Sequence, residues 1–142
     1  MTNTAYTRIG RSYSFESAHF LPKVPQGHRC RNLHGHTYRV DVVIKGTIDL
    51  RGFVKDFAEM DEQIQPILNQ IDHRLLNEVQ GLENPTAEII AHWLLERIAN
   101  CETVRVWEND NCWAEVSRYP HLCRHIGTVM QSRGFRRARL PR

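Results

Sequence analysis

The chain has 142 residues, of which 41% are hydrophobic and 25% are charged, and its formal net charge is +3. This length and composition are typical of one globular domain and exclude a disordered chain. No apolar run is long enough to span a membrane, and the first residues lack the apolar segment of a signal peptide. We therefore expect a cytoplasmic protein that does not contact a membrane.

The positive charge is concentrated at the C-terminal end. Residues 118–142 contain seven arginines and no acidic residue, whereas residues 1–117 contain 12 basic and 16 acidic residues. We divide the chain accordingly into a domain over 1–117 and an arginine-rich extension over 118–142. A basic extension can contact nucleic acid or phosphate, but chain ends commonly have no fixed partner, and we do not expect nucleic acid to be the main ligand.

The first half of the domain alternates between polar and apolar residues in two places. Residues 6–16 place Ile9, Tyr13 and Phe15 on one face, and residues 34–46 are apolar at nearly every second position. Because successive side chains of a strand point to opposite faces, both segments are predicted to be strands.

Two helical patterns follow. After Asp56 the apolar residues recur at steps of three and four, which predicts an amphipathic helix with Asp56 as its N-cap. Pro66 lies inside this pattern and predicts a kink or a break, after which the apolar spacing resumes. The second pattern begins near residue 84, and either Asn84 or Thr86 can cap it.

Two short alternating segments complete the domain, at 103–108 and 112–117, and the sequence N-D-N between them is typical of a hairpin turn. The predicted order is strand, strand, helix, helix, strand, strand. This order favours an α+β domain in which two helices cover one face of a four-stranded antiparallel sheet.

Residues 30–36 read C-R-N-L-H-G-H and contain three side chains that can bind a metal. His34 and His36 lie two apart on a predicted strand, so their side chains share a face and can bind one ion. Catalytic zinc typically has three protein ligands and an open position. His19, near the end of the first predicted strand, is the candidate third ligand because strand pairing brings it beside residue 36.

Three interpretations of Cys30 remain open on the residues alone. The next cysteine is Cys101, which is too far along the chain for a zinc finger. Cys30 is either a fourth ligand that closes a structural site, a thiolate that does chemistry beside an open zinc position, or a small residue in a turn.

Two other places carry candidate chemistry. The carboxylate of Asp72 can orient the imidazole of His73 for general acid–base catalysis. Glu108 can accept two parallel N–H bonds from a guanidine-like edge of a heterocycle. Each has a structural alternative as well, namely a polar helix terminus for the Asp72–His73 pair and a solvated strand end for Glu108.

Several of these segments together resemble the 6-pyruvoyltetrahydropterin synthase family. They occur in the family's order over residues 6–117: F-E-S-A-H (15–19), C-R-N-L-H-G-H (30–36), F-V-K-D-F (53–57), I-D-H-R-L-L-N (71–77), L-E-N-P-T-A-E (82–88) and V-W-E (106–108). Three residues separate Cys30 from H-G-H. This gap and F-V-K-D-F are similar to the bacterial branch that serves queuosine biosynthesis.

The resemblance implies roles for eight residues. It implies His19, His34 and His36 as zinc ligands, Cys30 as the catalytic base, Asp72 and His73 as the rest of the proton-transfer set, Glu108 as the group that holds the pterin ring and joins the relay, and Thr86 as part of the pterin pocket. Lys23, Arg29 and Arg31 are further candidates to contact a triphosphate, on charge alone.

The activity that the resemblance implies is that of a carbon–carbon lyase that uses Zn²⁺. It would convert 7,8-dihydroneopterin triphosphate into 6-carboxy-5,6,7,8-tetrahydropterin and release acetaldehyde and triphosphate. One alternative is elimination of triphosphate alone, which gives 6-pyruvoyltetrahydropterin. The other, from a different class, is a zinc-stabilised nucleic-acid-binding module.

The resemblance also implies a fold and an assembly. The family has a tunnelling fold (T-fold), whose subunits assemble around a central barrel. Such proteins are commonly hexamers with active sites at subunit interfaces. We therefore expect a homo-oligomer, in which exposed edges of the sheet are covered by neighbouring subunits.

Overall fold

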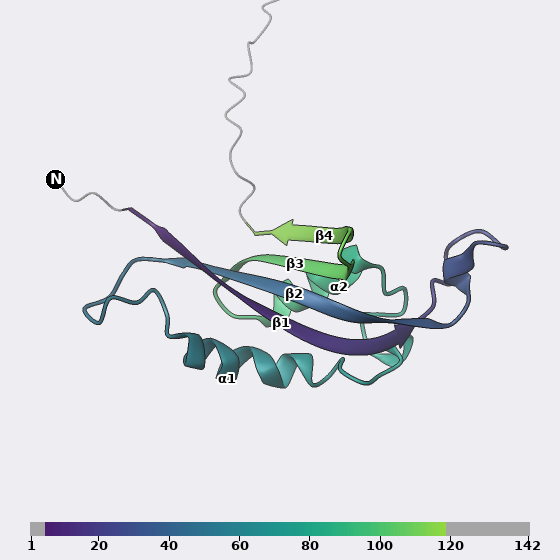
Figure 1. The fold of residues 1–142 in the computed structure, drawn as a ribbon, viewed down its shortest axis with the longest axis horizontal. Helices are drawn as coiled ribbons and strands as arrows, with labels where there is room; N and C mark the ends of the chain where they lie inside the picture. Colours follow the sequence, from purple (N-terminus) through teal and green to yellow (C-terminus); the bar gives the residue numbers. More distant parts are fainter. Residues whose placement is uncertain (1–4, 119–142) are drawn as a thin grey trace, which may run out of the picture.

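Four antiparallel strands form one sheet in the order β1-β2-β3-β4 (Figure 1). The computed structural model describes residues 5–118, so most of the arginine-rich extension lies outside the described residues. The elements in chain order are β1 (Thr7–His19), the 3-10 helix η1 (Arg29–Arg31), β2 (His34–Gly46), α1 (Phe57–Leu68), the 3-10 helix η2 (Leu76–Glu78), α2 (Ala87–Arg97), β3 (Cys101–Asn109) and β4 (Cys112–Ser117). The predicted α+β class, element order and antiparallel sheet are confirmed.

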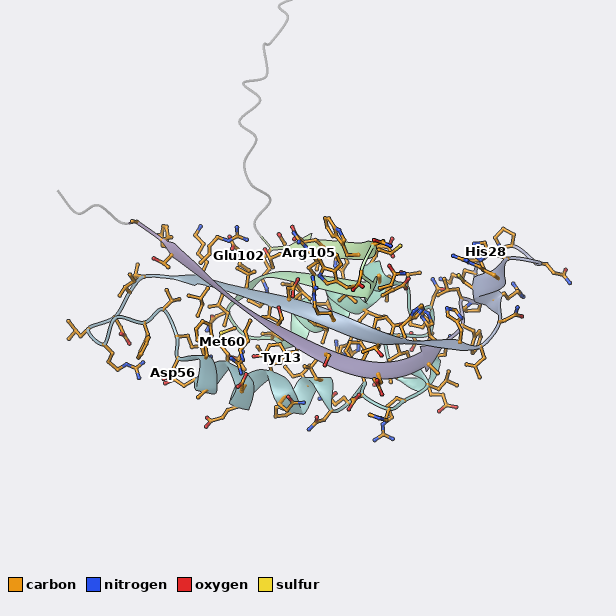
Figure 2. All side chains as sticks on the ribbon, viewed as in Figure 1. Tyr13, His28, Asp56, Met60, Glu102 and Arg105 are labelled. Carbon is orange, nitrogen blue, oxygen red and sulfur yellow. The ribbon has the colours of Figure 1, made fainter. Side chains whose placement is uncertain are left out.

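One face of the sheet is buried beneath both helices. Val40 and Val42 of β2 lie directly opposite Val106 and Val104 of β3, so their side chains point to the same face and all four are buried. Helix α1 adds Met60 and two further residues at four-residue steps to the same core, and Met60 lies on the side of α1 toward the sheet (Figure 2). The apolar residues that alternate along the strands and those spaced four apart along the helix therefore pack together in a single core.

Both helices begin as the sequence predicts. The Asp56 side chain accepts a hydrogen bond from Ala58 N at 2.8 Å, and Thr86, rather than Asn84, caps α2 by accepting one from Ile89 N at 3.3 Å. Within residues 5–118, neither helix has the length and hydropathy required to cross a bilayer.

The segment after Pro66 differs from the prediction. Helix α1 ends at Leu68, and the apolar residues that follow are buried through turns and η2 rather than through a resumed helix. The backbone turns here toward the edge of β1, where Ala18 N donates to Arg74 O at 3.0 Å and His73 N donates to Glu16 O. These hydrogen bonds take the place of those that a continued helix would make. The spacing of apolar residues along the sequence does not reveal them, because their partners lie in β1.

Strand β1 ends at His19, three residues later than the predicted strand over 6–16. The loop between β1 and β2, which contains η1 and His28, extends beyond the sheet at the end opposite the loop that leads to Asp56 (Figures 1 and 2). The candidate chemistry therefore lies at one end of the sheet, where β1 ends and β2 begins.

Candidate active site

Three histidines meet where β1 and β2 pair. His19 lies directly opposite His34 in the antiparallel register, and His36 lies opposite Ser17. Their ring centroids are 4.5 Å (His19–His34), 5.1 Å (His19–His36) and 5.0 Å (His34–His36) apart. One nitrogen of each ring lies within 4.8 Å of the others, so the structure brings together the three ligands that the sequence predicted.

The hydrogen bonds of these rings leave nitrogen lone pairs facing one another. His19 Nδ1 lies 2.8 Å from Pro85 O, and His34 Nδ1 lies 2.7 Å from Asn32 O. A carbonyl only accepts, so each Nδ1 carries the proton and each Nε2 presents a lone pair. The two Nε2 atoms are 3.0 Å apart, and the buried His36 Nε2 has no hydrogen-bond partner among residues 5–118.

This geometry fits a cation held by three nitrogens. Two facing lone pairs and one buried nitrogen without a donor are unfavourable unless a positive ion lies between them. Burial lowers the pKa of His19 to about 4 and also lowers that of His36, which keeps both rings neutral as ligands must be. Zinc accepts such a set and keeps a fourth position open for chemistry.

Gly35 allows β1 and β2 to approach closely between the two histidines. A Cβ at this position would lie 3.2 Å from Ser17 O, which is closer than side chains normally pack. The glycine therefore has a structural role. It lets His34 and His36 pair with β1 in the register that brings His19 to them.

Cys30 lies in the same cavity as the histidines. The cavity has a volume of about 450 Å³ and is lined by His19, Leu21, Arg29, Cys30, His34, His36, Glu108, Asn109 and Cys112. The thiol is free and half-buried. Its backbone is fixed on both sides, since Cys30 N donates to His28 Nδ1 at 3.1 Å and Cys30 O accepts from Leu21 N at 2.8 Å.

Glu108 reaches this cavity from β3. Its carboxylate raises the pKa of His36, although burial outweighs this and the net shift is downward. The Glu108 carboxylate makes no hydrogen bond or ion pair with any residue of the described chain, so its oxygens are free to accept donors from a ligand.

Cys112 also lines the cavity, which sequence reasoning missed. Asn109 and Cys112 are register partners across the turn between β3 and β4. The predicted hairpin turn was a sufficient signal, because the residues that flank a hairpin turn must lie side by side.

Asp72 and His73 form the expected pair but not in this cavity. His73 Nδ1 lies 3.0 Å from Asp72 Oδ2, and a hydrogen bond from Glu16 N is the main cause that lowers the pKa of Asp72. His73 has a φ of 53°, a conformation uncommon for residues other than glycine. It lines a separate cavity of about 590 Å³ along the edge of β1, which shares only His36 with the first.

Thr86 is placed by its role as a helix cap. Its hydroxyl accepts from Ile89 N, and the preceding residue, Pro85, accepts from His19 through its carbonyl. Thr86 does not line the cavity of the three histidines in the described chain.

Comparison with known proteins agrees with this arrangement. Residues 8–119 match the sequence profile of the family described as 6-pyruvoyl tetrahydropterin synthase. A protein of Synechocystis named 6-carboxy-5,6,7,8-tetrahydropterin synthase is 40% identical over 96 residues, which cover 63% of this chain and 73% of that protein. A protein of Pyrococcus furiosus named dihydroneopterin monophosphate aldolase is 33% identical over 116 residues, covering 77% of this chain and 96% of that protein.

A solved structure has the same fold. The 6-pyruvoyl tetrahydropterin synthase of Caenorhabditis elegans superposes with a TM-score of 0.74 and 24% identity, over 82% of this chain and 99% of that chain. This likeness confirms the predicted T-fold of the subunit. The family profile matches most of the chain, and the Synechocystis relative is 40% identical to the chain over the matched residues. The chain therefore belongs to the 6-pyruvoyl tetrahydropterin synthase family.

Proposed function

We propose that the protein is a zinc-dependent carbon–carbon lyase of queuosine biosynthesis. It converts 7,8-dihydroneopterin triphosphate into 6-carboxy-5,6,7,8-tetrahydropterin, with release of acetaldehyde and triphosphate. The observation that carries the proposal is the single cavity in which three histidines face one another beside Cys30 and Glu108. The name of the Synechocystis relative supports this activity. A cytoplasmic location stays a prediction from the sequence.

The three histidines would hold zinc, and the ion, when bound, would supply a Lewis acid that polarises the side chain of the substrate. Cys30 is the proposed base that moves protons at the side-chain carbons, because its thiol shares the cavity with the histidines and makes no disulfide. Glu108 is proposed to accept N–H bonds from the pterin ring, since its carboxylate has no other partner in the described chain.

Asp72 and His73 are proposed to complete the relay from a second subunit. Within one subunit His73 and Cys30 line different cavities, so this pair does not face the same substrate as Cys30. A homo-oligomer in which the β1 edge of one subunit adjoins the histidine cavity of another would bring them together. The family resemblance implies a hexamer with active sites at subunit interfaces, which would allow this arrangement.

The test is turnover of dihydroneopterin triphosphate by zinc-loaded protein, with products identified by mass. A carboxypterin and acetaldehyde are expected. A pyruvoylpterin without acetaldehyde would support the alternative of triphosphate elimination alone, and the absence of any product would refute both.

The role of Cys30 is tested by Cys30→Ala. This variant is expected to keep one zinc per chain and to lose about 10²- to 10⁴-fold in turnover, the usual contribution of a general base. Cys112→Ala removes the other described thiol of the cavity and is the matched control, with turnover expected to stay within the same order. Loss of zinc from Cys30→Ala would show instead that Cys30 is a fourth ligand.

A further inference from the structure

The loop between β1 and β2 presents three cations near the histidine cavity, and the structure separates their roles. Lys23, Arg29 and Arg31 all lie within seven positions of Cys30 along this loop, and the sequence alone does not rank them. Each is a positive group of the kind that binds phosphate. What distinguishes them is where each side chain lies and what it already contacts.

Arg31 is committed to the loop itself. Its Nη1 donates to Pro22 O at 3.1 Å and to Val24 O at 2.9 Å, which ties the two arms of the loop together. A guanidinium whose donors are used by backbone carbonyls has fewer left for a ligand. Arg31 therefore acts as a structural residue of the loop, and Lys23 does not line the histidine cavity.

Arg29 has the opposite character. It lines the histidine cavity together with Cys30 and Glu108, and its side chain is exposed. Among residues 5–118 no carboxylate or carbonyl forms an ion pair or hydrogen bond with its guanidinium. Arg29 is thus a cation without a partner at the wall of the cavity. The other charged residue of this wall is Glu108, which is proposed to hold the pterin ring.

The backbone of Arg29 is held in place relative to Cys30. Arg29 is the first residue of η1 and is covalently adjacent to Cys30, whose N–H is held by His28 Nδ1 and whose carbonyl is held by Leu21 N. Asn32 N also donates to Arg29 O at 3.1 Å, so the backbone of Arg29 is held as well. Because this backbone is held next to Cys30, the guanidinium starts from a defined point at the wall of the cavity, within one side-chain length of the part of the substrate that reacts.

We propose that Arg29 is the residue of this loop that recognises the triphosphate end of the substrate. The inference rests on the proposed function and extends it to a specificity-determining residue. A guanidinium pairs with phosphate oxygens through two parallel N–H bonds. In the elimination step the C–O bond to triphosphate breaks, and its electron pair leaves on the phosphate oxygen. Arg29 would stabilise that negative charge without gaining or losing a proton.

The experiment measures binding rather than turnover. Neopterin and neopterin triphosphate, which share the ring and differ in the phosphates, are titrated by their fluorescence against the zinc-loaded protein. The dissociation constant for neopterin divided by that for neopterin triphosphate reports recognition of the phosphates alone. In Arg29→Gln we expect the dissociation constant for neopterin triphosphate to rise about 10- to 100-fold, as for loss of a charge-assisted hydrogen bond, with that for neopterin unchanged.

Two further variants serve as controls. Arg29→Lys keeps the positive charge but not the two parallel N–H donors of the guanidinium, and it should recover part of the preference for neopterin triphosphate over neopterin. Arg31→Gln should lower the thermal stability and leave the ratio of dissociation constants unchanged. Because the Arg29 side chain makes no contact that holds the loop, Arg29→Gln should unfold at the temperature of the unaltered protein.

The outcomes separate the two proposals. An unchanged ratio in Arg29→Gln, or a ratio that falls only in Arg31→Gln, would overturn the assignment of Arg29 while leaving the proposed function standing. Failure of the unaltered protein to bind either compound would refute the proposed function, and this inference with it.

Discussion

The neutral state of His19 follows from its surroundings. The side chain is 1% exposed, its Nδ1–H is held by Pro85 O, and its Nε2 faces His34. Burial disfavours the charged ring and is the main cause that lowers its pKa. The same features that prepare the ring for a metal therefore make the metal-free fold sensitive to acid.

We predict that the metal-free protein loses stability between pH 6.5 and about pH 4. The pKa of His19 falls from 6.5 to about 4 on folding, so the unfolded chain binds a proton in this window and the native state does not. The free energy of unfolding must then decrease as the pH falls through the window and level off below it, by about 3 kcal/mol at most. Urea unfolding at a series of pH values measures this.

His19→Asn removes the ring with the larger pKa shift and should make the pH profile less steep, while His36, whose pKa is also lowered, retains a smaller contribution. The exposed His92, on α2, provides the matched control, since His92→Asn should retain the slope. Equal slopes in the unaltered protein and in His19→Asn would show that another group carries the effect. Added zinc should stabilise the unaltered protein and not His19→Asn.

At the scale of elements, the start of α2 orients His19, one of the three proposed metal ligands. Thr86 caps the helix and Pro85, one residue earlier, accepts the hydrogen bond that fixes the His19 ring. The first turn of α2 thus sets both where the helix begins and which nitrogen of His19 presents its lone pair.

Thr86→Ala is predicted to lower the free energy of unfolding by about 1 kcal/mol, the usual cost of removing an N-cap hydroxyl. Thr86→Ser keeps an oxygen that can accept from Ile89 N and should retain most of the stability. Chemical denaturation of the three proteins measures the difference. A loss in Thr86→Ser as large as that in Thr86→Ala would show that the methyl group, and not the cap, is responsible.

At the scale of the whole molecule, the separation of His73 from Cys30 has a measurable consequence. If each complete site combines Cys30 of one subunit with His73 of another, two inactive variants can restore each other. We predict that Cys30→Ala and His73→Ala, each inactive alone, regain about one quarter of the unaltered turnover when mixed equally and reassembled, because one site in four receives both intact residues.

The control for this experiment is the double variant Cys30→Ala/His73→Ala, mixed with the unaltered protein in the same way. In that mixture about one quarter of the sites again receive both residues, so the two mixtures should agree. No recovery from the two single variants would mean that Cys30 and His73 act within one subunit, which contradicts the proposed arrangement.

Much of the subunit was predictable from the sequence because it depends on local periodicity. Alternation defined β2 to the residue, Asp56 was the predicted cap of α1, and Thr86 was one of the two candidate caps of α2. The i, i+2 spacing of His34 and His36 placed both rings on one face. Each of these is decided by neighbours along the chain, so no knowledge of tertiary contacts is needed.

Other features were decided only by the tertiary structure. Helix α1 ends at Leu68 because the following backbone bonds to the edge of β1, and the role of Arg29 differs from that of Arg31 because two carbonyls of the loop occupy only Arg31. His73 and Cys30 line different cavities for the same kind of reason. The sequence by itself determined which residues are able to do chemistry. Beyond the three histidines, which residues share a site depends on contacts between distant segments, and only the tertiary structure decided it.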